Sequence, residues 1–214
     1  MHISAYAYIY IVIMVNLTTI RNHVVIMLNG GLSSALTYHN VNHTLDVTLQ
    51  CLAIAGEEGI TDKQILLELQ IAALYHDTGF MFTYLKHEER SCKIARQQLP
   101  GFGIDKKVIE NICDLIMATK VPQEPGNNHQ KIICDADLDY LGREDFFETG
   151  HKLRLELIAH KLISGENDWE DRQLNFLQTH RYFTKTSRQK RGPVKMKFMK
   201  QLLNHKINKR PNYY

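Results

Sequence analysis

Residues 61–79 read Thr-Asp-Lys-Gln-Ile-Leu-Leu-Glu-Leu-Gln-Ile-Ala-Ala-Leu-Tyr-His-Asp-Thr-Gly, and this stretch indicates the fold class. Thr61 followed three positions later by Gln64 is a capping-box pattern, which is typical of a helix start. The apolar residues after it recur at helical spacing and predict one buried face: Ile65, Leu66, Leu69, Ala72 and Ala73. The sequence therefore predicts a helix that runs up to His76-Asp77, with Gly79 allowing the chain to turn directly afterwards.

Helical periodicity continues on both sides of this stretch. One helix is predicted from near His39 to Gly56, and two more follow later in the chain. Their apolar residues recur every three or four positions: Leu45, Leu49 and Leu52; Val108, Ile109, Ile112, Cys113 and Ile116; and Leu153, Leu157, Ile158 and Leu162. Stretches rich in Pro and Gly separate the helices at residues 99–103 and 121–128. We therefore expect an all-α, multi-helix bundle.

Length and composition favour one soluble globular domain with appendages. The chain has 214 residues, of which 44% are hydrophobic and 23% are charged. Residues 3–15 carry no charge, but this run is shorter than the ~20 residues that span a bilayer, and no basic residue precedes it as in a secretory signal. The four cysteines form no Cys-x-x-Cys pair, which favours a reducing compartment. We expect a cytoplasmic protein without a membrane span.

The charges are distributed unevenly along the chain. Residues 172–214 contain 12 Lys and Arg and no acid, whereas residues 1–171 contain 14 Lys and Arg against 23 Asp and Glu. A basic helical tail of this kind can dock on the acidic body of its own chain, which is the interpretation that we favour. Clustered cations also attract nucleic acid or anionic lipid, so a nucleic-acid contact through the tail stays as an alternative.

Histidine and aspartate occur together in three separated segments. His39 and His43 are four residues apart and would share one face of a helix. The pair His76-Asp77 follows an apolar helix, and residues 134–139 place three carboxylates in an otherwise apolar segment. Two imidazoles and two carboxylates suit a divalent ion such as Mn, Fe, Mg, Zn, Co or Ni, with water at the remaining positions. An ion held in this way can activate water and polarise a phosphoryl oxygen.

The ordered pattern of His43, then His76-Asp77, then an Ala-Asp pair ending at Asp137 resembles the HD superfamily of metal-dependent phosphohydrolases. The likeness covers roughly residues 20–165, and Tyr38-His39-Asn40-x-x-His43 is similar to the opening motif of the cyclic-nucleotide phosphodiesterase branch. The resemblance implies that one divalent metal is bound by His43, His76, Asp77 and Asp137. It also implies a catalytic role for Asp77 and that His39 could protonate the leaving oxygen.

Two assignments in this site stay open. Asp137 is favoured over Asp135 as the ligand because the family's ligand usually follows Ala, which leaves Asp135 and Asp139 as supporting or helix-capping groups. His87 matches the position of an extra histidine in two-metal members. The later histidines of those members are absent from residues 117–120, so we expect one ion.

Hydropathy, charge and the resemblance together divide the chain into an apolar N-terminal extension at residues 1–16, an HD-type metal-dependent phosphohydrolase domain at residues 17–183, and a basic helical tail at residues 184–214. We expect the domain to cleave a phosphomonoester or phosphodiester of a nucleotide-like small molecule by metal-activated water. The alternative is a signalling or scaffold module that binds metal or nucleotide without turnover and recruits a partner through its basic tail.

Overall fold

The computed structural model describes residues 5–164 and 166–209, and the side chains of residues 17–164 and 168–208. Within these ranges the chain folds into ten α-helices and three short 3-10 helices, with no strand, which confirms the all-α prediction. The elements are α1 (Ala5–Gly31), α2 (Val41–Glu57), α3 (Lys63–Tyr75), η1 (Thr78–Met81), α4 (His87–Gln98), η2 (Leu99–Phe102), α5 (Lys106–Ala118), α6 (Asn128–Asp137), η3 (Asp139–Gly142), α7 (Phe146–Ala159), α8 (Glu166–Thr179), α9 (Lys185–Lys190) and α10 (Gly192–Lys209).

The helices that carry the candidate ligands begin at side-chain caps. Asn40 caps α2 by accepting hydrogen bonds from the backbone N–H groups of Asn42 and His43. Asp62 caps α3 in the same way, toward Gln64 and Ile65. The predicted capping box at Thr61 is therefore wrong by one residue, because the Asp62 carboxylate already satisfies these donors.

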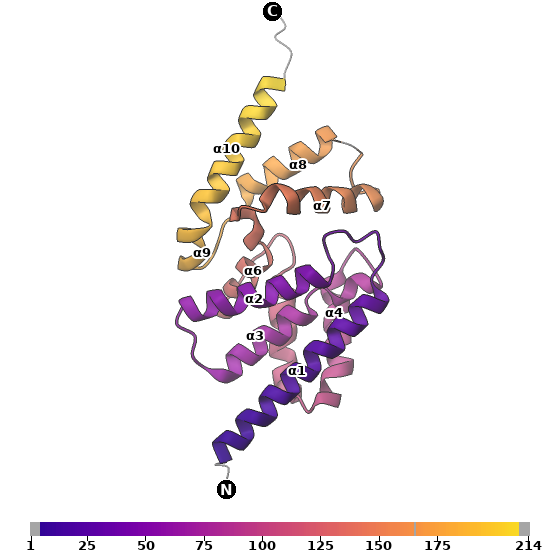
Figure 1. Ribbon diagram of the computed structural model, residues 1–214, viewed down its shortest axis with the longest axis vertical. Helices are drawn as coiled ribbons and strands as arrows, with labels where there is room; N and C mark the ends of the chain where they lie inside the picture. Colours follow the sequence, from indigo (N-terminus) through magenta and orange to yellow (C-terminus); the bar gives the residue numbers. More distant parts are fainter. Residues whose placement is uncertain (1–4, 165, 210–214) are drawn as a thin grey trace, which may run out of the picture.

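The α1–α6 helices share one hydrophobic core, in the lower part of Figure 1. α2 packs against both α3 and α6, so the helices bearing the ligand candidates are neighbours. The predicted Leu45, Leu49 and Leu52 face of α2 is wrong at Leu49, which is 65% exposed. The side that α2 buries instead carries His43, Thr44, Val47, Thr48, Cys51, Ile54 and Ala55.

The α7–α10 helices pack around a second, smaller cluster, in the upper part of Figure 1. Its aromatic residues come from distant segments, and the rings of Phe146 and Phe198 stack at 4.9 Å. Basic side chains from the C-terminal segment pair with acids of the body: Lys190 Nζ lies 2.5 Å from Glu57 Oε1, and Arg191 Nε lies 2.8 Å from Asp139 Oδ1. The described part of the basic segment therefore packs on the body.

The proposed domain boundaries at residues 16 and 183 stay predictions. The backbone of α1 runs through the first boundary without a break, and its later residues Ile20, Val24 and Leu28 are buried in the first core. Residues 1–4 and 210–214 of the two predicted appendages lie outside the described residues. Among the helices as far as they are described, none has the length and apolar character needed to cross a membrane.

Candidate metal centre

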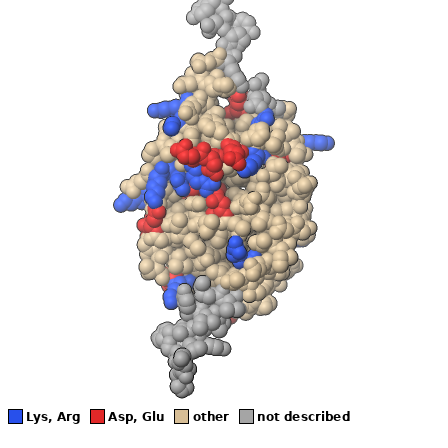
Figure 2. Space-filling model, in the orientation of Figure 1, with Lys and Arg blue, Asp and Glu red and all other residues tan. Residues whose placement is uncertain are grey.

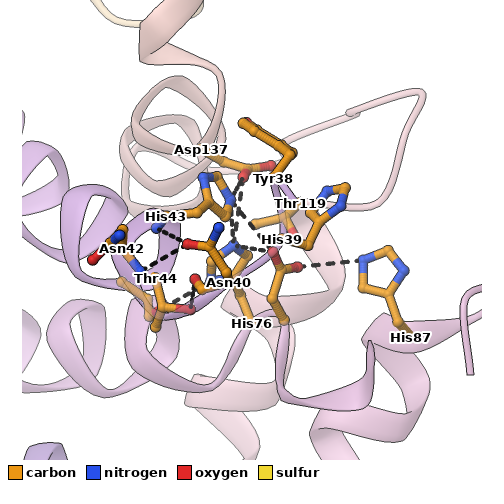
Figure 3. Close-up of polar contacts among 12 residues, drawn as sticks. Tyr38, His39, Asn40, Asn42, His43, Thr44, His76, His87, Thr119 and Asp137 are labelled. Carbon is orange, nitrogen blue, oxygen red and sulfur yellow. Dashed lines mark hydrogen bonds and ion pairs between the residues drawn. The ribbon is translucent and has the colours of Figure 1, made fainter. Parts of the chain in front are cut away.

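Three helix ends converge to bring the predicted ligands together (Figure 3). His43 lies in the first turn of α2, directly after its Asn40 cap. His76 is the C-terminal cap of α3, and Asp77 follows it at the start of η1. Asp137 is the last residue of α6. Because α2 packs against both α3 and α6, these four side chains reach a common point.

The ligand atoms lie within a few ångströms of one another. The Nε2 atoms of His43 and His76 are 3.4 Å apart. Asp77 Oδ2 lies 3.3 Å from Nε2 of His43 and 3.2 Å from Nε2 of His76. Asp137 Oδ1 lies 3.3 Å and 3.5 Å from the same two nitrogens. His43, His76 and Asp137 form a group whose ligand atoms all lie within 4.8 Å, which could hold a metal ion.

Three observations fit this site to a divalent ion. Donor atoms bound tetrahedrally at ~2.1 Å from one ion lie about 3.4 Å apart, close to the observed spacings. Nδ1 of His76 lies 2.7 Å from the carbonyl oxygen of Ala73, a contact that fixes the ring and leaves Nε2 free as a ligand. Oδ2 of Asp77 is buried and has no hydrogen bond of good geometry to a described residue. A cation would satisfy that atom.

The contacts among the four groups shift their pKa values. Burial alone would lower the pKa of His43 and His76, but contacts with Asp77 and Asp137 outweigh it and raise both pKa values. Burial opposes ionisation of the two carboxyl groups as well. The neighbouring imidazoles nevertheless hold the pKa of Asp77 well below its usual range and that of Asp137 at about 2. In the metal-free site these contacts favour protonation of the imidazoles, and a divalent ion would compete with those protons.

His39 lies beside the centre, but not for the reason that its spacing suggested. It precedes α2 instead of sharing a helical face with His43, because Asn40 has an extended backbone and the helix begins only at Val41. Its ring is held by Glu156 of α7, which contacts His39 Nδ1 and accepts a hydrogen bond from the His39 N–H at 3.0 Å. The centroids of the His39 and His43 rings are still only 5.7 Å apart.

Glu156 was not found by sequence reasoning. Its side chain is fully buried, and it accepts further hydrogen bonds from the Tyr38 N–H at 2.9 Å and the Tyr84 hydroxyl at 2.9 Å. Burial opposes its ionisation, yet these donors, with His39 foremost, lower its pKa. No local motif marks Glu156, because its partner His39 lies 117 residues earlier. The signal in the sequence that could have indicated Glu156 was an acidic residue within the apolar helical pattern of residues 153–162.

His87 contacts the centre from its outer side. Its Nε2 lies 3.4 Å from Asp77 Oδ1, the oxygen that faces away from the other two imidazoles. The Phe80 ring is stacked between His39, at 4.2 Å, and His87, at 3.9 Å. Gly79 permits this approach, because a Cβ there would lie 2.0 Å from the His87 carbonyl oxygen. Close packing, and not the expected freedom to turn, is therefore the constraint on Gly79.

The remaining aspartates of residues 134–139 lie outside the ligand group. Asp135 points the opposite way and accepts hydrogen bonds from Phe183 N, Thr184 N and Thr184 Oγ1 at 2.7 to 2.8 Å. Asp139 Oδ1 pairs with Arg191 at 2.8 Å. The geometry thus places Asp137 with the histidines and gives Asp135 and Asp139 to the packing of the C-terminal segment. That Asp137 binds a metal remains a prediction.

Comparison with known proteins agrees with this arrangement. Residues 40–139 match the sequence profile of the HD domain, a segment that contains all four ligand candidates. A solved structure, a predicted HD superfamily hydrolase from an uncultured Thermotogales bacterium, shares the fold with a TM-score of 0.56 and 21% sequence identity, covering 86% of this chain and 91% of that one. No curated protein sequence matches significantly. Residues 40–139 are therefore similar to the HD domain, and this segment contains a His and Asp cluster that could hold a divalent metal.

Proposed function

We propose that this protein is a metal-dependent phosphohydrolase that cleaves a phosphate ester of a nucleotide-like small molecule. The observation that carries the proposal is the convergence of two imidazole Nε2 atoms and two carboxylates, with Asp77 Oδ2 buried and lacking a well-formed hydrogen bond among the described residues. A divalent ion bound there would supply the Lewis acid that activates water and neutralises charge on the phosphoryl group.

The residues around the ligands have separate tasks in this proposal. His39 donates a proton from Nε2 to the leaving oxygen, because Glu156 engages Nδ1 and leaves the other ring nitrogen for proton transfer. Glu156 is a positioning residue that holds the backbone and the ring of His39 together. Phe80 stacks on the His39 ring and limits its rotation. His87 orients Asp77 through its outer oxygen.

A substrate panel with metal-loaded protein tests the proposal. Purified protein with added Mn²⁺ should release phosphate from, or open, at least one of a set of nucleoside monophosphates, cyclic nucleotides and nucleoside triphosphates. The variant H39A should lose that activity and keep its metal. Bound metal together with no turnover across the panel would overturn the hydrolase assignment and support the binding module instead.

A further inference from the structure

A polar pocket opens beside the metal centre and shares two of its residues. The cavity has a volume of about 260 Å³, and His43 and Asp137 form part of its wall. Side chains from the segment before α2, from α2 itself, and from the η3–α7 region complete it. A larger cavity of about 530 Å³ between α7, α8 and α10 shares no residue with the centre. The smaller pocket is therefore the one placed to hold the rest of a substrate whose phosphate lies at the metal.

The cations of this pocket already have acidic partners. Arg143 Nη1 lies 2.6 Å from Asp46 Oδ2, and its Nη2 lies 2.7 Å from Asp145 Oδ2. Lys152 Nζ pairs with Glu148 Oε1 at 2.7 Å. Figure 2 shows acids and cations close together over a wider area as well, with acidic and basic side chains next to one another across the middle of the visible face. The pocket wall thus offers no excess positive charge for a second or third phosphate group.

One hydroxyl in the pocket lacks a partner. The Tyr38 side chain is 7% exposed and lines the cavity, and its hydroxyl makes no hydrogen bond with any described residue. Its ring packs against His43 at 4.6 Å, so the Tyr38 side chain lies next to a candidate ligand. Buried hydroxyls ordinarily have partners, and a bound molecule would supply one here.

We propose that the pocket binds the hydroxyl-rich alcohol portion of a phosphate monoester, such as a phosphorylated sugar or a nucleoside monophosphate, and that the Tyr38 hydroxyl donates a hydrogen bond to it. This inference rests on the proposed function and narrows it. Amide and hydroxyl groups of Asn42 and Thr149 line the same wall and suit an alcohol with several hydroxyls. Esters with additional phosphates would meet Asp46 and Asp145 without a free cation.

Binding and turnover by the Mn²⁺-loaded full chain test the pocket. Ribose 5-phosphate should bind about tenfold more tightly than inorganic phosphate in calorimetry, and AMP should be cleaved with a higher kcat/KM than ATP. In the Y38F variant, the KM for ribose 5-phosphate should rise about 5- to 10-fold, and it should rise less for phenyl phosphate, which has no further hydroxyl. Y182F is the matched control, because the Tyr182 hydroxyl donates to Leu138 O, and Tyr182 does not line the pocket.

The two proposals fail in different ways. Equal affinity for ribose 5-phosphate and inorganic phosphate, a preference for ATP, or a Y38F variant that behaves like Y182F would overturn the pocket assignment. Tight binding of ribose 5-phosphate without cleavage of any ester would overturn the hydrolase function and retain the pocket.

Discussion

The four ligand candidates lie in α2, at the junction of α3 and η1, and in α6, whereas α7 supplies Glu156, which orients His39 instead of joining the ligand group. The ligand candidates lie at helix ends whose positions depend on local caps and on neighbouring helices in one core. Glu156 and the anchors of the C-terminal segment reach the site across long stretches of chain. The α1–α6 region thus contains the ligand candidates, and the α7–α10 region orients His39 beside them.

Asp135 and Asp137 test this division of roles most sharply, because both lie on α6. Asp137 faces the other ligand candidates, whereas Asp135 contacts the C-terminal segment. D137N should lose metal affinity and lower activity to background, since it removes a ligand charge. D135N should keep its metal and lose about 2 to 3 kcal/mol of unfolding free energy, since it disrupts three buried hydrogen bonds to the C-terminal segment. Metal analysis and denaturant unfolding of both variants check this. Loss of metal in D135N, with metal retained in D137N, would show that Asp135 and not Asp137 is the ligand.

Removing the candidate proton donor should separate catalysis from metal binding. H39A should lower kcat by about 10² to 10⁴ while the metal content stays that of the unmodified protein. The loss should be smaller for p-nitrophenyl phosphate, whose leaving group departs without a proton. Steady-state kinetics with both esters measures the difference. Equal losses for the two leaving groups would remove His39 from proton transfer.

Metal affinity should rise with pH across the neutral range. The pKa values of His43 and His76 are raised in the folded, metal-free protein, so metal must displace their protons. The affinity for Mn²⁺ should weaken about tenfold per pH unit for each imidazole that is protonated, as pH falls below those raised values. In the metal-free protein, folding stability depends on pH in the opposite direction. The two imidazoles stabilise the fold fully below about pH 6.5, and this stability is lost as the pH rises through their raised values. Calorimetric titration and thermal unfolding at pH 6, 7 and 8 test both statements.

The smallest effect should come from the positioning residue. E156Q should lower kcat about tenfold, because the amide replaces the carboxylate that holds His39 Nδ1, and KM should change little. The pH profile of kcat should shift as well, which a merely structural change would not cause. E110Q, which alters an exposed ion pair on α5, is the control. An unchanged pH profile in E156Q would show that Glu156 only supports the fold.

Sequence reasoning reached the ligand candidates because their signal is local. His76 and Asp77 end an apolar helix, His43 follows a cap, and the order along the chain is enough to propose one site. The same reasoning missed Glu156 and Phe80, whose roles depend on how α7 and η1 pack near His39. It also misplaced the buried face of α2, because a helix that carries a polar centre buries His43 and Thr44 and leaves Leu49 exposed.

The metal content of the purified protein tests the central claim most directly. Elemental analysis after loading with Mn²⁺ and removal of free ion should find about one ion per chain in the unmodified protein and none in the folded variant H76A/D77A. Folding of the variant is checked by its thermal transition and helical circular dichroism. Unmodified protein that takes up no divalent ion, or a variant that retains it, would contradict the proposal that these side chains form a metal centre.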